Sequence, residues 1–88
     1  MKYKVEFTKY ALKCLKKLDY YTQKILITWI ENNLNDCENP HYIGKSLKGN
    51  KSGEWRYRVG DYRIIAIIED GILRILVIAI GHRKNIFK

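Results

Sequence analysis

The sequence predicts one α+β domain, in which one face of a single sheet is covered by a helical hairpin. The chain has 88 residues, the size of a single domain with one hydrophobic core. An alternating N-terminal segment is followed by two segments with helical spacing, and the second half contains strand patterns separated by turn signals. We therefore expect residues 1–88 to form an N-terminal strand, two helices and a three-stranded antiparallel meander within one sheet.

The first half of the chain has the pattern of a strand followed by two helices. Charged and apolar side chains alternate over residues 2–7, as in a half-buried strand. From Thr8, a residue type suited to an N-cap, apolar residues recur every three or four positions up to Leu18. A second helical pattern begins after Asp19 and runs to about Asp36. These two helices are expected to pair as a hairpin.

The second half begins with a loop and continues as strands. Asn39-Pro40 and scattered glycines and serines mark residues 38–53 as loop. The strands are expected at 55–59, 62–68 and 72–80, separated by Gly60-Asp61 and Asp70-Gly71, which are typical of two-residue hairpin turns. The last strand is almost continuously apolar and should lie centrally in the sheet.

Positive charge is concentrated in this second half. Seventeen Lys and Arg against nine Asp and Glu give a net charge of +8. Residues 1–44 hold seven basic and five acidic side chains (+2), whereas residues 45–88 hold ten and four (+6). All five arginines lie between Arg56 and Arg83. Because a guanidinium donates two parallel hydrogen bonds to phosphate oxygens, this clustering predicts a phosphate-binding site.

The sequence also disfavours several classes of protein. The N-terminus lacks the apolar stretch of an export signal, and the longest apolar run, 75–80, is too short to span a membrane. We therefore expect a cytoplasmic protein without a membrane partner. Cys14 and Cys37 have no C-x-x-C spacing, which favours reduced thiols, and no cofactor or metal is expected.

The two hairpin turns predict which residues share a face of the sheet. A turn at Gly60-Asp61 places Arg58 opposite Arg63, with Arg56 on the same face. Like charges directly opposite each other repel, so this arrangement favours an anion site. The alternative is three solvated charges with Asp61 and Glu54 as local partners. A two-residue turn at Asp70-Gly71 would pair Arg63 with Ile78.

That second register would bring the end of the chain to the arginines. Ile80 and His82 would then point to the arginine face, with Arg83 alongside. The expected pocket therefore comprises Arg56, Arg58, Arg63, His82 and Arg83.

The motifs that carry this charge resemble the RelE family of toxins from bacterial type II toxin–antitoxin systems. They are GKSLKG at 44–49, WRYRVGDYRII at 55–65 and Gly81-His82-Arg83. The resemblance covers essentially the whole chain and implies a RelE-like fold, similar to microbial ribonucleases. It also implies a metal-independent endoribonuclease that cuts A-site mRNA on the 70S ribosome by 2′-hydroxyl attack and is held inactive by a cognate antitoxin.

The resemblance also assigns roles to residues. Arg56 and Arg58 correspond to basic residues that stabilise or activate the attacking group, Arg63 to the arginine on the scissile phosphate, and Arg83 to a basic residue near the leaving oxygen. Phe87 stands where the family often has a tyrosine. Phenylalanine keeps a ring that can stack on a base but lacks the hydroxyl. The residues expected to contact RNA are Lys48, Lys51, Lys84 and Phe87.

Proton transfer and function each leave alternatives at this point. Arginine stays protonated, so His82 is the candidate acid or base, although it could instead cap the strand end or stack on RNA. Glu54 could act as a base or form an ion pair. A ParE-like toxin acting on DNA gyrase without cutting RNA, or a non-catalytic nucleic-acid-binding module, would also fit a basic domain of this size.

Overall fold

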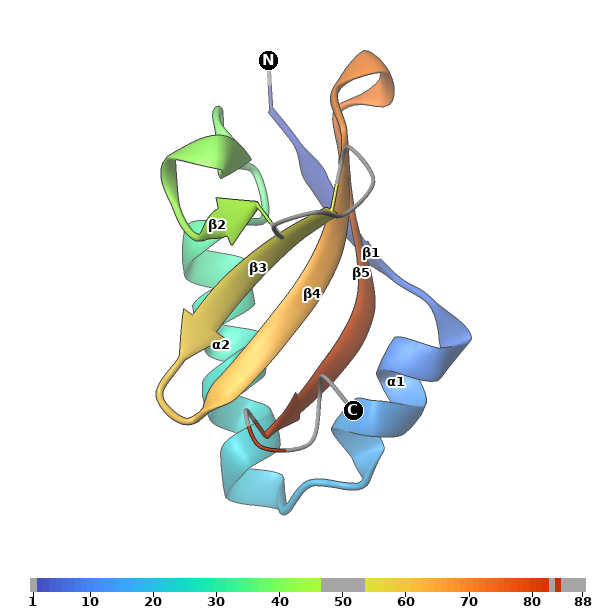
Figure 1. Cartoon of the computed structure of the whole chain (residues 1–88), viewed down its shortest axis with the longest axis vertical. Coiled ribbons are helices and arrows are strands. Elements are labelled where there is room, and N and C mark those ends of the chain that lie inside the picture. The colour runs from blue at the N-terminus through green and yellow to red at the C-terminus, as the bar shows by residue number, and fades with distance from the viewer. Residues whose placement is uncertain (1, 47–53, 83, 85–88) are drawn as a thin grey trace.

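The computed structural model describes residues 2–46, 54–82 and 84, and shows one sheet with both helices on the same face (Figure 1). The strand order in this described part is β1-β5-β4-β3-β2, with β1 parallel to β5 and the other neighbours antiparallel. The elements are β1 (Lys4–Phe7), α1 (Lys9–Lys16), α2 (Tyr20–Asn33), β2 (Lys45–Ser46), β3 (Glu54–Val59), β4 (Tyr62–Glu69) and β5 (Arg74–His82). The expected α+β class is confirmed, and β5 lies between two strands as predicted.

Both helices begin at side chains that cap them. The Thr8 hydroxyl accepts a hydrogen bond from the Ala11 backbone N–H at 3.0 Å, and the Asp19 carboxylate accepts one from the Thr22 N–H at 3.1 Å. Hydrogen bonds from Thr22 hold the pKa of Asp19 below its usual value. Helix α2 ends before Asp36, which has a positive φ of 64°. No helix in the described ranges is long and apolar enough to span a membrane.

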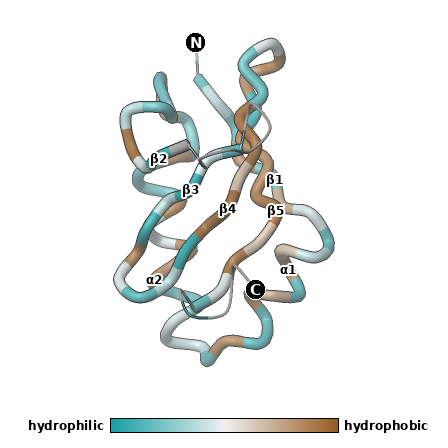
Figure 2. Tube along the Cα trace, viewed as in Figure 1, coloured by the Kyte–Doolittle hydropathy of each residue, from teal (hydrophilic) through white to brown (hydrophobic). Residues whose placement is uncertain are grey.

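The core lies between the helices and the inner face of the sheet. Figure 2 shows the apolar residues gathered along β4 and β5. Leu26 and Ile30 of α2 are fully buried, and burial of each such side chain contributes about 1.5–3 kcal/mol. They pack in one cluster with residues of both helices and the strands, among them Ala11, Leu15, Tyr57, Ile64, Ala66, Ile75 and Val77.

The second hairpin differs from the predicted two-residue turn. Its connection is a 3-10 turn at Asp70–Ile72 followed by Leu73, which adopts left-handed backbone at φ 54°. Strand pairing therefore closes at Glu69 and Arg74, whose side chains form an ion pair, and Arg74 also contacts Glu6 at 3.3 Å. The longer connection shifts the pairing at the start of β5, from Arg74 to Val77, by two residues from the expected register.

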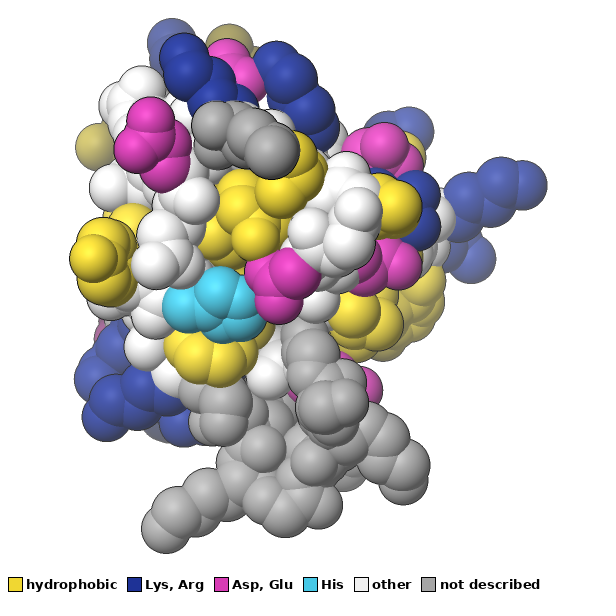
Figure 3. Space-filling model, turned by 90° about the horizontal axis from the view of Figure 1, so that it is seen from above, with side chains coloured by type: hydrophobic (Ala, Val, Ile, Leu, Met, Phe, Trp, Pro, Cys, Tyr) yellow, Lys and Arg dark blue, Asp and Glu magenta, His cyan; other side chains and the backbone are white. Residues whose placement is uncertain are grey.

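A polar cluster holds three distant segments together at the end of the molecule viewed in Figure 3. The Tyr3 hydroxyl donates to Asp70 Oδ1 at 2.5 Å, and His41 Nε2 lies 3.1 Å from the same oxygen. The His41 ring also meets Trp55 edge to face, with centroids 4.9 Å apart. The hydrogen bonds from Tyr3 and His41 hold the pKa of Asp70 below its usual value. This cluster ties the N-terminus and the turn at Pro40–Tyr42 to the second hairpin.

We expect Asp70→Asn to lower the melting temperature by about 2–5 °C at pH 7, the scale of a partly exposed ionic contact. Because the pKa of Asp70 is lowered on folding, its contribution is full above its unfolded value near 3.9 and is lost as pH falls through the folded value. Calorimetric melting at pH 7 and at about pH 2 should show the difference closing in acid. Glu38→Gln, at an exposed carboxylate outside the cluster, is the control. An Asp70→Asn difference that persists undiminished at pH 2 would contradict the assignment.

Candidate functional site

The hairpin of β3 and β4 places three arginines on one face of the sheet. Gly60 supplies the positive φ, 61°, at its turn, and the predicted register is confirmed along the whole hairpin. Arg58 is therefore directly opposite Arg63, and Arg56 is opposite Ile65. Residues directly opposite in an antiparallel pair project to the same side, so these guanidinium groups share the face that the helices leave uncovered.

The alternate residue of β3, Tyr57, fixes the direction of this face. Its side chain is fully buried on the helix side, and its hydroxyl donates to the Pro40 carbonyl oxygen at 2.8 Å. Burial raises the pKa of Tyr57 well above its ordinary value. Because neighbouring side chains on a strand point to opposite faces, the burial of Tyr57 forces Arg56 and Arg58 outward.

These side chains form the wall of a pocket of about 280 Å³, lined by Gly44, Lys45, Arg56, Arg58 and Arg63. Lys45 belongs to β2 and lies opposite Arg56 in the register. The lining that the structure describes thus carries four cationic side chains and no carboxylate. Glu54 lies on the same strand as Arg56 and Arg58 but outside this lining. The arrangement is suited to holding an anion with several oxygens, since each guanidinium offers a planar pair of donors.

Gly44 allows the loop to approach β3 closely enough to complete the pocket. It has a φ of 75°, and a Cβ placed on it would lie 2.3 Å from the Arg56 carbonyl oxygen and 2.7 Å from Tyr57 Cδ1. No side chain fits in that space. Gly44 therefore delivers Lys45 to the pocket, and sequence reasoning missed both as pocket residues. Gly44 can be recognised in the sequence as a residue that permits a turn or a close backbone contact. A two-residue strand, however, has no sequence pattern that predicts its pairing with β3.

His82 does not reach the arginine pocket, and its predicted placement is wrong. It lies directly opposite Tyr62, and the two rings meet edge to face with centroids 5.4 Å apart. Its Nδ1 accepts a hydrogen bond from the Lys84 backbone N–H at 3.2 Å. Tyr62 alternates with Arg63 along β4, so His82 shares the face opposite to the arginines.

A β-bulge explains this reversal. Ala66 pairs with Val77, but Ile65 pairs with Ala79, so Ile78 has no residue directly opposite. The longer turn shifts the pairing of β5 by two residues, which leaves each side chain on its expected face of the sheet. The bulge shifts the pairing by one further residue, which moves each later side chain to the opposite face. Arg63 is consequently opposite Gly81 instead of Ile78, and Ile80 is buried on the helix side.

The remaining predicted residues fall mostly outside the described residues. Arg83, Lys48, Lys51 and Phe87 are among these, and their expected roles stay predictions. Lys84 is described and is exposed just after β5. In the described ranges, no three His, Cys, Asp or Glu side chains are grouped as a metal site would require.

Comparison with known proteins finds relatives over nearly the whole chain. The family model described as ParE toxin of type II toxin-antitoxin system matches residues 5–87. Toxin RelE of Mycobacterium tuberculosis is 30% identical over 86 residues, which cover 98% of this chain and 87% of the relative. Toxin RelG of the same organism is 30% identical over 89 residues, covering 100% and 99%. The crystal structure of the toxin-antitoxin complex RelBE2, also from M. tuberculosis, superposes with a TM-score of 0.83 at 26% identity, covering 97% of this chain and 95% of that chain.

We expect Gly44→Ala to destabilise the protein by about 2–4 kcal/mol, because the methyl group would require both a strained φ and displacement of β3. Urea unfolding followed by tryptophan fluorescence measures the change. Gly71→Ala is the matched control, since a Cβ there meets nothing within 4 Å. Equal stability of the two variants would show that the close approach at Gly44 is unimportant.

Proposed function

The chain belongs to the RelE/ParE superfamily of toxins from type II toxin–antitoxin systems, and we propose that this toxin is a ribosome-dependent mRNA endoribonuclease. The observation that carries the proposal is the convergence of Arg56, Arg58 and Arg63 with Lys45 on one pocket. Placing Arg58 directly opposite Arg63 costs stability through charge repulsion. A phosphate bound between them would turn that repulsion into binding energy.

The pocket suits cleavage of RNA by its own 2′-hydroxyl. In this reaction the 2′-hydroxyl loses its proton to solvent water as its oxygen attacks the adjacent phosphorus, the bond to the 5′-oxygen breaks, and a cyclic phosphate is left on the first nucleotide. The five-coordinate phosphorane carries more negative charge than the starting diester. Arginines held around that charge stabilise the transition state more than the ground state. We assign this role to Arg56, Arg58 and Arg63.

Proton transfer needs a group other than arginine, because a guanidinium keeps its proton. Lys45 carries the one ammonium group among the described lining residues, and an ammonium can donate a proton to the departing 5′-oxygen. We therefore propose Lys45 as the proton donor. His82 lies on the other face of the sheet beside Tyr62, which favours a packing role for this residue.

The small size of the pocket supports a substrate that is positioned by a larger body. A site of about 280 Å³ has room for a phosphate and its immediate surroundings but little surface with which to bend an RNA strand. Most of the catalytic advantage of alignment would come from the ribosome holding the messenger. Arg83 is proposed to act near the leaving oxygen, as the family resemblance implies, and Lys48, Lys51, Lys84 and Phe87 are proposed to contact the RNA. The cytoplasm, where ribosomes work, is the expected location.

An antitoxin is the second proposed partner. The structural relative RelBE2 is a toxin-antitoxin complex that matches nearly the whole of this chain. A net charge of +8 also favours an acidic protein that would neutralise the surface on binding.

A second candidate function is favoured by the matching family model, which is named for ParE toxins. A ParE-like activity would act on DNA gyrase and leave RNA intact. The arginine pocket favours cleavage, since a gyrase inhibitor has no need of four cations around a phosphate-sized space. Linearised plasmid DNA in the presence of gyrase and this chain, without mRNA scission, would establish the second function instead.

We expect Arg63→Gln to reduce A-site mRNA cleavage by about 10²–10³-fold, the usual effect of removing one donor from a developing oxyanion. Primer extension on messenger bound to purified ribosomes measures the cut ends. Lys13→Gln is the matched control, because it removes the same charge at an exposed position of α1 outside the pocket. Equal cleavage by the two variants would exclude a catalytic role for the pocket, and no cleavage by the wild type would reject the ribonuclease proposal.

His82→Gln should retain messenger cleavage within about threefold of the wild-type rate, because a side chain on the opposite face contributes at most indirectly. The same primer-extension assay applies, with Lys45→Gln as the contrasting variant. A loss of a hundredfold or more in His82→Gln, with unchanged melting temperature, would place the histidine in the reaction after all.

A further inference from the structure

Trp55 of β3 lies beside the pocket wall but on the opposite face of the sheet from the arginines. It alternates with Arg56 along β3, and it pairs with Ser46 of β2 on one side and with Ala66 of β4 on the other. Its ring is partly buried against the hydrophobic core. A side chain on this face points away from a phosphate in the pocket, so Trp55 can act on the reaction only through its neighbours.

The indole of Trp55 holds the backbone that leads into Lys45. Its Nε1 donates a hydrogen bond to the Ile43 carbonyl oxygen at 2.6 Å. Its Cδ1 lies so close to Gly44 that a Cβ placed on the glycine would be 3.0 Å away. The ring therefore contacts the peptide between Ile43 and Gly44 at its carbonyl oxygen and also the α-carbon that follows. These contacts fix the backbone immediately before Lys45.

This anchor matters because the backbone at Lys45 has little intrinsic stiffness. The strand that carries Lys45, β2, has two residues, and its register with β3 has two residue pairs. Gly44 precedes it with a φ of 75°, and a glycine allows a wider range of backbone angles than any other residue. Rotation at Gly44 would carry Lys45 away from the pocket. The hydrogen bond from Trp55 opposes that rotation at the preceding peptide.

The indole is itself held from its other neighbours. The His41 ring meets it edge to face, with centroids 4.9 Å apart and planes at 87°, and His41 Nε2 lies 3.1 Å from Asp70 Oδ1. The Tyr57 hydroxyl holds the Pro40 carbonyl oxygen at the start of the same loop. The segment between Pro40 and Lys45 is thus attached to β3 at both ends, and Trp55 is the attachment nearer to the pocket.

We propose that Trp55 is a positioning residue, which aligns the Lys45 ammonium with the departing 5′-oxygen by fixing the Ile43 carbonyl. The proposal rests on the proposed ribonuclease function and on Lys45 as its proton donor. The proton passes from Lys45 Nζ to the 5′-oxygen as the bond from phosphorus to that oxygen breaks, and the neutral amine then regains a proton from water. The 2′-hydroxyl proton goes to solvent, as above.

Alignment is demanding for this proton donor. A general acid acts only within hydrogen-bond reach of the atom that it protonates, and a misplacement of about 1 Å can lower a rate by about 10²-fold. Lys45 carries its ammonium on a flexible four-carbon stem, so the position of the ammonium is defined only as well as that of its backbone. The contact at Ile43 is therefore expected to affect the chemical step more than the binding of RNA.

A double-mutant cycle separates this role from a purely structural one. Trp55→Phe keeps a ring and removes the indole N–H donor. If Trp55 acts through Lys45, the substitution lowers the cleavage rate when Lys45 is present and has little further effect in Lys45→Gln. If Trp55 only stabilises the fold, it lowers the rate by the same factor in both backgrounds.

The assay is single-turnover cleavage of A-site mRNA on purified ribosomes, with the full chain at saturating concentration. Trp55→Phe should lower the rate by about 10–30-fold, with the apparent affinity for the ribosome within about threefold. In the Lys45→Gln background the further loss should be less than about twofold. Retention of the full effect there would overturn the positioning role.

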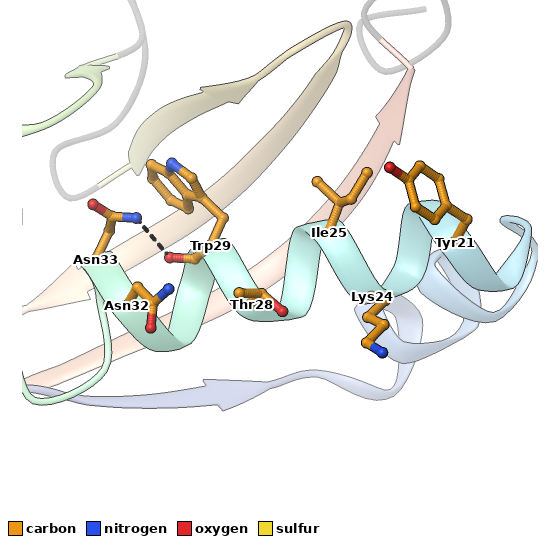
Figure 4. A pocket seen from close by; sticks show the side chains of 7 residues that line it. All are labelled: Tyr21, Lys24, Ile25, Thr28, Trp29, Asn32 and Asn33. Carbon is orange, nitrogen blue, oxygen red and sulfur yellow. Dashed lines mark hydrogen bonds between the residues drawn. The ribbon is translucent and has the colours of Figure 1, made fainter.

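Trp29→Phe is the matched control, because it makes the same replacement at the other tryptophan. Trp29 lies on α2, as drawn in Figure 4, and its ring packs on Tyr57 with centroids 5.8 Å apart. This variant also loses part of a core ring, and it should cleave within about threefold of the wild-type rate. Equal losses for Trp29→Phe and Trp55→Phe would assign both to core packing and overturn the positioning role.

Inorganic phosphate gives a readout that does not depend on cleavage. Titrated into the ¹⁵N-labelled full chain, it should shift the backbone N–H signals of Lys45, Arg58 and Arg63, which line the pocket. Trp55→Phe should reduce the shift at Lys45 by half or more and retain the shifts at the two arginines. An unchanged response at Lys45 overturns the positioning role and leaves the ribonuclease function in place. Absence of cleavage by the wild type rejects the ribonuclease function and, with it, a positioning role in that reaction.

Discussion

The burial of Tyr57 is the constraint on which the rest of the structure depends. Its ring lies under Trp29, and its hydroxyl is satisfied by the Pro40 carbonyl oxygen. The close passage of Gly44 over β3 leaves this strand no freedom to slip by one residue. Since a one-residue slip would exchange the faces, this single aromatic side chain keeps the flanking arginines outside the core. The anion pocket on one face of the sheet and the packed core on the other both depend on that one placement.

Sequence reasoning predicted the first hairpin completely because its register depends on local chemistry. Gly60 can adopt positive φ without strain, and the two-residue turn then dictates every pair in β3 and β4. The second hairpin looked equally local, but Asp70 is held by Tyr3 and His41, which are distant in sequence. Leu73 closes this turn with left-handed backbone. Residue propensities would not predict leucine in that conformation. The longer turn by itself leaves the faces unchanged, and it is the bulge at Ile78, which no turn signal marks, that moves His82 to the other face.

The pocket itself was predictable only in part, for a related reason. Three of its cations belong to the first hairpin and follow from the hairpin register. Lys45 arrives from a two-residue strand, whose pairing depends on the space that Gly44 leaves above the Arg56 carbonyl. Segments of that length carry too few residues for any periodicity to be visible. This domain thus builds its cationic site from one local hairpin motif and one close backbone contact.

The bulge at Ile78 has a consequence for how related chains should be compared. A single residue inserted into or deleted from β5 would exchange the inward and outward side chains of everything after it while leaving the motif letters intact. Two family members could therefore align perfectly through Gly81 and His82 and yet present opposite residues to the same surface. In this family the presence of the bulge, as much as the identity of the residues in β5, would determine which side chains of that strand face solvent and which face the core.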